Sequence, residues 1–229
     1  MSGEAQGQRE PAAAGDADET PTVAVLDYGA GNLRSAQRAL QRAGAHARLI
    51  TAAADAQGAD ALVVPGVGHF GQCVRQLRAQ GFEPLLGRWA AAGWPVLGIC
   101  VGMQILFESS EEDPEPGLGL LPGVVRRLPD RVSVPHMGWN VLTVVRDDPL
   151  VAGVDGAHAY FVHSYAPEAG GDHVVATSFH GVAFGAVVRA GSVAATQFHP
   201  EKSADKGRRV LANFLTGVAQ RPAACGPAR

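Results

Sequence analysis

The sequence predicts an α/β protein with an open, largely parallel sheet flanked by helices and a β-rich second half. In the first half, short apolar runs that end in glycine or proline alternate with segments whose apolar residues recur at helical spacing. This alternation is typical of a parallel sheet that helices cover on both faces. In the second half, short β-rich runs are separated by Gly, Pro or Asp, which indicates hairpins that extend or flank the sheet.

The elements of the first half follow from periodicity and from the glycines that end them. Buried apolar runs predict strands at residues 23–26, 46–50, 61–66 and 95–99. Helical spacing predicts helices at residues 33–44, 70–81, 82–93 and 101–110. The first of these helices places Leu33, Ala36 and Leu40 on one face and has Gly44 as its C-terminal stop.

The second half contains β-rich runs at residues 119–128, 140–145, 157–167, 173–181, 182–191 and 192–198. The chain then closes with a helix over residues 203–218, in which Val210, Leu211 and Phe214 share one face. There is no internal repeat of solenoid period, so the elements form one α/β unit.

Length, charge and cysteine content restrict the class of protein. Residues 1–21 and 219–229 are predicted to be disordered tails, because such compositions bury little apolar area, and this leaves one domain at residues 22–218. A net charge of −3 gives no reason to expect nucleic acid or an anionic membrane as a partner. The three cysteines are scattered and form no CxxC pair, which argues against a disulfide framework or a metal site and favours the cytoplasm.

The first candidate for chemistry is Cys100, which lies in the stretch VLGICVGMQ between a predicted strand and a predicted helix. Such a strand-to-helix turn is a nucleophile elbow, and Gly98 and Gly102 give it the room it needs. The helix dipole would also favour a thiolate at this position. The alternative is a core cysteine on a buried strand end.

A nucleophile of this kind needs a base and a group that orients the base. The stretch QFHPEKS offers His199 at the end of a predicted strand and Glu201 two residues later. Open α/β sheets bind ligands at this edge, so one imidazole nitrogen can face Cys100 while the other bonds Glu201. The alternative is a loop histidine beside a solvated glutamate.

Two glycine-rich turns follow predicted strands. In PGVG, the backbone N–H groups of Val67 and Gly68 can stabilise a developing oxyanion together with the Val101 N–H, or the segment is an ordinary strand–helix turn. The stretch GAGN begins like a dinucleotide fingerprint, but Arg34 stands where the third glycine belongs, which argues against nucleotide binding.

Six motifs in order carry a resemblance to a known family: DYGAGNLRS, PGVGHF, LGICVGMQILFESSEE, PHMGWN, YFVHSY and QFHPEKS. The chain resembles class I (triad) glutamine amidotransferases and, more narrowly, the glutaminase subunits of imidazole glycerol phosphate synthase. The resemblance spans almost the whole predicted domain and implies the class I amidotransferase fold.

The resemblance also implies roles for individual residues. Cys100, His199 and Glu201 match the catalytic triad, and Val67, Gly68 and Val101 match the oxyanion site. The matches to substrate-binding positions are Gln104, Glu112, Ser164 and Tyr165. The matches to positions near the synthase subunit are Asn32, Trp139, Tyr160 and Lys202, although Trp139, like Met137, is equally compatible with a core position.

The activity implied is hydrolysis of glutamine to glutamate and ammonia through a γ-glutamyl thioester, with no metal or other cofactor. The implied partner is a (β/α)8-barrel cyclase subunit, which receives the ammonia and forms imidazole glycerol phosphate and an aminoimidazole carboxamide ribotide in histidine biosynthesis. Three alternatives remain open from the residues: a glutaminase that serves another synthase, a cysteine hydrolase with the same elbow, and a non-catalytic scaffold.

Overall fold

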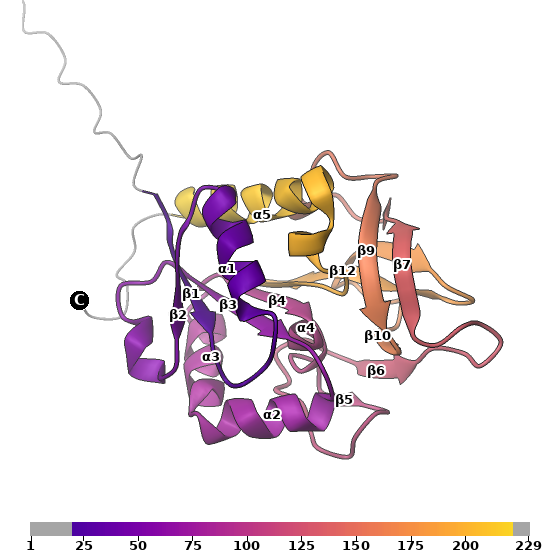
Figure 1. The fold of residues 1–229 in the computed structure, drawn as a ribbon, viewed down its shortest axis with the longest axis horizontal. Coiled ribbons are helices and arrows are strands. Elements are labelled where there is room, and N and C mark those ends of the chain that lie inside the picture. The colour runs from indigo at the N-terminus through magenta and orange to yellow at the C-terminus, as the bar shows by residue number, and fades with distance from the viewer. Residues whose placement is uncertain (1–19, 222–229) are drawn as a thin grey trace, which may run out of the picture.

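The computed structural model describes residues 20–221, which form a three-layer α/β fold with a smaller β-rich flank (Figure 1). The predicted tails fall mainly on residues 1–19 and 222–229, which lie outside the described part. The last helix ends at Ala219, one residue into the predicted C-terminal tail.

The central sheet has eight strands in the order β2-β1-β3-β4-β13-β12-β11-β8. Neighbours from β2 to β13 pair in parallel, and the remaining neighbours pair antiparallel. The parallel part comprises β2 (His46–Ile50), β1 (Thr22–Leu26), β3 (Ala61–Gly66), β4 (Val96–Cys100) and β13 (Val193–Thr196). The antiparallel extension comprises β12 (Ala183–Ala190), β11 (Val174–Phe179) and β8 (Thr143–Val144). The predicted fold class is therefore confirmed.

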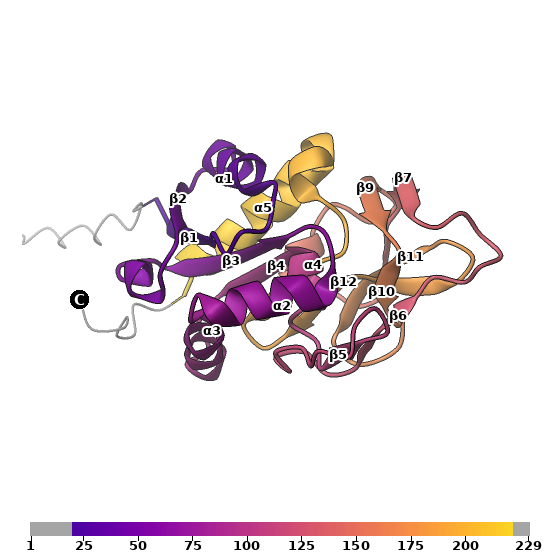
Figure 2. The same ribbon diagram turned by 60° about the horizontal axis from the view of Figure 1, so that its bottom comes forward.

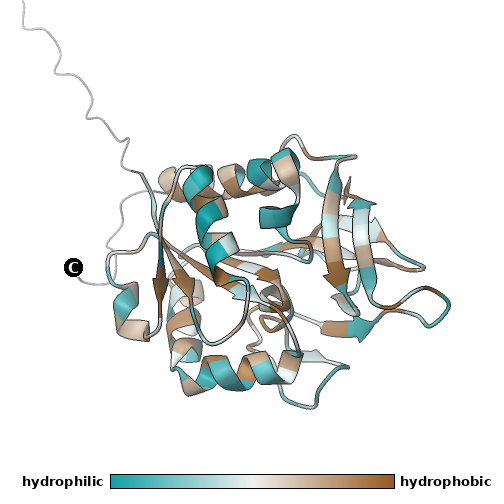
Figure 3. Ribbon diagram, in the orientation of Figure 1, coloured by the Kyte–Doolittle hydropathy of each residue, from teal (hydrophilic) through white to brown (hydrophobic). Residues whose placement is uncertain are grey.

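Helices cover both faces of the sheet. Helices α1 (Leu33–Arg42) and α5 (Ala204–Ala219) lie on one face, and α2 (Phe70–Ala79) and α3 (Phe82–Ala91) lie on the other (Figures 1 and 2). The parallel strands are apolar and buried because both faces are covered. Figure 3 shows these hydrophobic strands in the centre and hydrophilic residues along the outer helices.

Two smaller sheets flank the edge at which the parallel strands end (Figure 1). One is the ribbon of β7 (His136–Val141) and β9 (His158–His163), and the other has the order β10-β6-β5, with β10 (Tyr165–Pro167), β6 (Val124–Arg127) and β5 (Ser109–Ser110). Short 3₁₀ helices lie at Ala53–Ala56, Pro149–Val151 and Pro200–Lys202.

The helix predicted over residues 101–110 is much shorter than expected. Helix α4 covers only Val101–Gln104, and residues 109–110 form β5. The backbone carbonyls of residues 105–108 accept hydrogen bonds from the N–H groups of residues 117–121, so a returning loop replaces the helical partners. Ile105, Leu106 and Phe107 are all buried, because this loop covers the side that a surface helix would expose.

Candidate active site

Cys100 ends β4 and directly precedes α4, in the strand-to-helix turn that the sequence predicts. Its backbone has φ 57° and ψ −116°, a conformation that residues other than glycine rarely adopt. The side chain is almost fully buried, and its sulfur lies 3.8 Å from the Val162 carbonyl oxygen. The tight packing around the turn maintains this strained backbone, which sets the direction of the thiol.

Three glycines allow the turn to pack this closely. A Cβ at Gly102 would lie 1.9 Å from the Val64 carbonyl oxygen, and a Cβ at Gly66 would lie 2.4 Å from the Gly102 nitrogen. A Cβ at Gly98 would lie 2.8 Å from the Gly102 carbonyl oxygen. The contacting atoms belong to the backbone and cannot turn aside, so α4 rests on β3 only because these positions lack side chains.

His199 reaches the same edge of the sheet because β13 pairs in parallel with β4. In this register Thr196 lies opposite Ile99, so the residues that follow the two strands emerge side by side. The His199 N–H donates to the Tyr160 carbonyl oxygen at 3.0 Å, which ties the segment after β13 to β9. Sequence positions 100 and 199 are thereby brought to one site.

Glu201 orients the imidazole of His199. His199 Nδ1 lies 2.7 Å from Glu201 Oε1, and the same oxygen accepts a hydrogen bond from Asn32 Nδ2 at 2.5 Å. Both the His199 and the Glu201 side chains are almost fully buried. Because a carboxylate only accepts, Nδ1 carries a proton, and Nε2 is the nitrogen left to exchange one. Nε2 is buried and makes no hydrogen bond of standard geometry among the described residues.

The charges around His199 favour its protonated form. Burial by itself would lower the pKa of the imidazole, but interactions with Cys100 and Glu201 outweigh burial and raise the pKa to about 9. At neutral pH the His199 imidazolium is therefore paired with the Glu201 carboxylate. This arrangement suits a thiolate nucleophile and a proton donor for a leaving group.

One pocket contains Cys100 and His199 together with every predicted oxyanion and substrate-binding residue. It is lined by Val67, Gly68, Cys100, Val101, Gln104, Glu112, Pro135, Val162, His163, Ser164, Tyr165 and His199. Glu201 is absent from this lining because it lies behind the imidazole. Gln104 Nε2 donates both of its hydrogens, to the Tyr165 carbonyl oxygen at 2.8 Å and to Gln197 Oε1 at 3.1 Å. The Oε1 atom of Gln104 therefore remains available to accept a hydrogen bond from a ligand.

The turn that contains Val67 and Gly68 lines the same pocket as the Cys100 thiol. The Val67 carbonyl oxygen accepts a hydrogen bond from the Cys73 thiol at 3.5 Å, and Gly68 has a φ of +97°. Glu112, on the wall of the pocket, accepts the Phe70 N–H at the start of α2 at 2.8 Å. Helix α2 therefore anchors both the turn and the acidic side chain.

The residues predicted to contact a partner lie outside the pocket but close to the His199–Glu201 pair. The rings of Trp139 and Tyr160 are 6.0 Å apart, and Lys202 Nζ lies 5.9 Å from the Tyr160 ring. Asn32 contacts Glu201 from the start of α1. The alternative core interpretation of Met137 and Trp139 is wrong, since these side chains are 64% and 53% exposed on β7.

Sequence reasoning missed two polar groups of the site. Gln197 is fully buried, accepts from Gln104, and lies with Nε2 3.9 Å from the Cys100 sulfur. His163 lines the pocket and interacts electrostatically with His199. Gln197 stands two residues before His199 on the same segment, and this short spacing is the only signal in the sequence that points to it.

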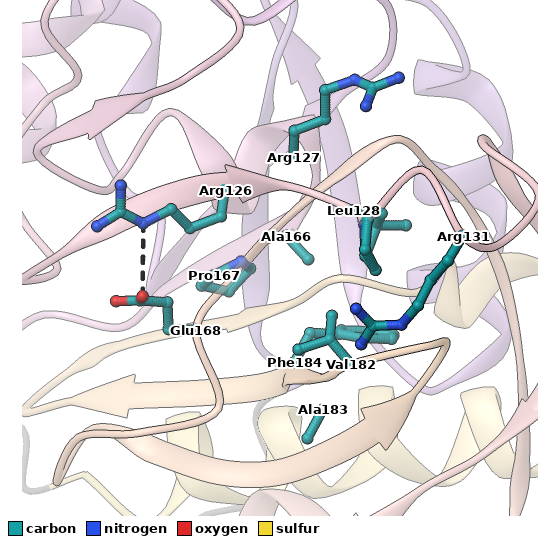
Figure 4. Close-up of a pocket in the computed structure, with 11 residues that line it drawn as sticks. Arg126, Arg127, Leu128, Arg131, Ala166, Pro167, Glu168, Val182, Ala183 and Phe184 are labelled. Carbon is teal, nitrogen blue, oxygen red and sulfur yellow. Dashed lines mark hydrogen bonds and ion pairs between the residues drawn. The ribbon is translucent and has the colours of Figure 1, made fainter.

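A second pocket lies elsewhere on the surface and has a different character. It is lined by residues 126–129, 131, 166–168 and 182–184, and no predicted site residue is among them (Figure 4). Its arginines are exposed, and two of them pair with carboxylates: Arg126 with Glu111 and Glu168, and Arg127 with Asp130. None of the side chains that line this pocket is both polar and buried.

Within residues 20–221, no cluster of three or more His, Cys, Asp or Glu side chains is arranged to hold a metal ion. The same residues include no helix that is long and apolar enough to cross a membrane.

Comparison with known proteins places this geometry in a family. The family model for class-I glutamine amidotransferases matches residues 24–218. The imidazole glycerol phosphate synthase subunit HisH of Renibacterium salmoninarum is 49% identical over 208 residues, which cover 86% of this chain and 94% of that protein. The HisH subunit of Deinococcus radiodurans is 50% identical over 209 residues, with 87% and 95% covered.

Solved structures share the fold. A crystal structure of a glutamine amidotransferase superposes with a TM-score of 0.68 at 26% identity, covering 86% of this chain and 98% of that chain. The structure of PurLQS from Thermotoga maritima gives a TM-score of 0.69 at 20% identity, covering 87% and 99%. The chain therefore belongs to the class-I glutamine amidotransferase family and, within it, to the group of imidazole glycerol phosphate synthase subunits named HisH.

Proposed function

We propose that this chain is the glutaminase subunit of imidazole glycerol phosphate synthase and hydrolyses glutamine through Cys100, His199 and Glu201. The observation that carries the proposal is the convergence of a strained cysteine and a histidine–carboxylate pair, from sequence positions 100 and 199–201, on one pocket. The catalytic domain is proposed to span residues 22–218.

The reaction begins with attack of the Cys100 thiolate on the side-chain carboxamide carbon of glutamine. The carbonyl oxygen becomes an oxyanion, for which the backbone N–H groups of Val101 and of the Val67–Gly68 turn are the proposed donors. Protonated His199 gives its Nε2 proton to the departing ammonia, which leaves a γ-glutamyl thioester on Cys100.

In hydrolysis of the thioester, the imidazole of His199 acts as a general base rather than a general acid. Neutral His199 takes a proton from water, the resulting hydroxide attacks the thioester carbon, and glutamate leaves as the thiolate is regenerated. Glu201 keeps the proton on Nδ1 and stabilises the imidazolium throughout both steps. Gln104, Glu112, Ser164 and Tyr165 are proposed to hold the substrate against Cys100.

The ammonia is proposed to pass to a (β/α)8-barrel cyclase subunit in a cytoplasmic heterodimer. There it would enter the ring closure that gives imidazole glycerol phosphate and an aminoimidazole carboxamide ribotide in histidine biosynthesis. Support for an interface comes from Met137 and Trp139, two large apolar side chains exposed on β7 beside the active site. Asn32, Trp139, Tyr160 and Lys202 are the proposed contacts.

The proposal is tested by assaying glutamine hydrolysis with and without the cognate cyclase subunit and its ribotide substrate. Cys100→Ala is expected to abolish glutamine-driven synthesis in the complex while synthesis from added ammonia continues. Glutaminase activity that survives in Cys100→Ala would refute the mechanism. Stimulation by another synthase, or cleavage of peptides without glutamine hydrolysis, would favour one of the other functions considered above.

A further inference from the structure

A continuous chain of side-chain hydrogen bonds runs from the β7–β9 ribbon to the wall of the active-site pocket. Asn140 Nδ2 lies 3.2 Å from His136 Nε2, and His136 Nδ1 lies 3.1 Å from His163 Nε2. His163 Nδ1 lies 2.9 Å from the Tyr165 carbonyl oxygen. This is the same oxygen that accepts a hydrogen bond from Gln104 Nε2.

The direction of these hydrogen bonds is determined at the Asn140 end. Asn140 Oδ1 accepts the Val141 N–H at 2.8 Å, and Nδ2 donates to the Phe179 carbonyl oxygen at 2.9 Å. A backbone N–H only donates and a carbonyl oxygen only accepts, so the amide has a single orientation. Its second Nδ2 hydrogen therefore points at His136 Nε2, which must accept.

The same argument determines which nitrogen carries the proton in each of the two imidazoles. A neutral His136 that accepts at Nε2 has its proton at Nδ1 and donates to His163 Nε2. His163, which accepts at Nε2, has its own proton at Nδ1 and donates to the Tyr165 carbonyl oxygen. That oxygen can only accept, so the far end of the chain independently requires the same direction. Both ends agree on one tautomer for each ring.

The surroundings keep both rings neutral and in place. His136 and His163 are 5% and 6% exposed, and His136 stacks between Phe161 and His180, whose ring centroids lie 5.1 Å and 4.2 Å away. Burial, then the charge of His180, lowers the pKa of His136 to about 4, and burial, then the charge of His136, lowers that of His163 to about 3. A second proton on either ring would place two N–H groups face to face.

We propose that Asn140, His136 and His163 are positioning residues. They hold the Tyr165 carbonyl oxygen in place, and this oxygen in turn fixes the orientation of the Gln104 side-chain amide that binds glutamine. The proposal rests on the glutaminase function proposed above. It also links the pocket to β7, because Asn140 and His136 lie on the strand that exposes Met137 and Trp139. None of the three positioning residues takes part in the chemistry at Cys100.

The first test measures the tautomers directly, by ¹⁵N chemical shifts of the His136 and His163 side chains in the wild-type protein at neutral pH. The expected result is a proton on Nδ1 of both rings. This result discriminates because each ring would be free to carry its proton on Nε2 if the contacts were incidental. A proton on Nε2 of either ring would overturn the proposal, whatever the enzymatic activity.

The second test uses kinetics of the complex with the cyclase subunit. His163→Phe keeps an aromatic ring against Phe184 and removes the hydrogen bond to Tyr165, and we expect it to raise KM for glutamine about threefold to tenfold. The change in KM should exceed any change in kcat, and the ammonia-dependent synthesis, which does not use the glutamine pocket, should stay near wild type. The matched control is His180→Phe, which keeps the stack on His136 but lies outside the hydrogen-bond chain, and its KM should be unchanged.

An unchanged KM in His163→Phe, or an equal rise in His163→Phe and His180→Phe, would overturn the proposal, since either result assigns the rings to packing alone. A different result would show that the proposed glutaminase function is wrong. A wild-type complex that does not hydrolyse glutamine would refute the glutaminase, while the tautomer measurement would still decide whether the network exists.

Discussion

The close approach of α4 to β3 makes Gly102→Ala the sharpest perturbation of the elbow. The new Cβ would lie 1.9 Å from the Val64 carbonyl oxygen, whereas a carbon and a carbonyl oxygen normally stay at least about 3.3 Å apart. The two backbones must therefore separate by about 1.4 Å. Val64 lies inside the sheet, paired with Gly98, so α4 and the Cys100 turn have to move.

Two consequences follow from this shift. Overpacking of this kind costs about 1–3 kcal/mol of the free energy of unfolding. A displacement of about 1 Å at the reacting group costs about a hundredfold in rate, so kcat for glutamine hydrolysis in the complex should fall by at least that factor. Synthesis from added ammonia should persist, because it does not require the Cys100 turn.

The assay compares Gly102→Ala with Gly87→Ala in urea denaturation and in glutaminase turnover. Gly87 lies inside α3, and a Cβ there meets no atom within 4 Å, so this variant should be as active as wild type and more stable by about 0.5–1 kcal/mol. Wild-type glutaminase activity in Gly102→Ala would refute the reasoning, because the turn would then not depend on the close approach.

Two further predictions concern pH. Because the pKa of His199 is raised to about 9, kcat should hold through pH 8 and fall as the imidazolium loses its proton near pH 9. In Glu201→Gln this decline should move to lower pH, since the carboxylate supports the proton, and a decline at the same pH would count against the pairing. Because His136 and His163 are neutral when folded, with pKa values of about 4 and about 3, the unfolded chain takes up protons as pH falls below about 6.5. The contribution of these two histidines to stability, measured by urea denaturation, should therefore be full above about pH 6.5 and decrease toward pH 4 by up to about 1.4 kcal/mol per pH unit for each histidine, and replacing both by Phe should remove this part of the slope.

Much of the candidate site was predictable because its determinants are local. The strand, the cysteine and the flanking glycines of the elbow fall within residues 96–102, and His199 and Glu201 are two residues apart. The prediction of a helix over residues 101–110 was wrong because the interactions that decide the conformation of this segment are not local. The carbonyl groups of residues 105–108 instead accept hydrogen bonds from a loop nine to fifteen residues further along the chain, and no local sequence pattern indicates this competition.

The sequence by itself determined the α/β class, the order of the strands along the chain, the family and the residues proposed for catalysis. These properties follow from periodicity, glycine positions and short motifs, each of which involves residues that are close together in the sequence. Only the tertiary structure decided that Trp139 is exposed, that Gln197 contacts Gln104, and that the imidazoles of His136 and His163 lie within hydrogen-bonding distance. These features depend on strand pairing that joins residues 27 to 93 positions apart, so they arise only when the chain has folded.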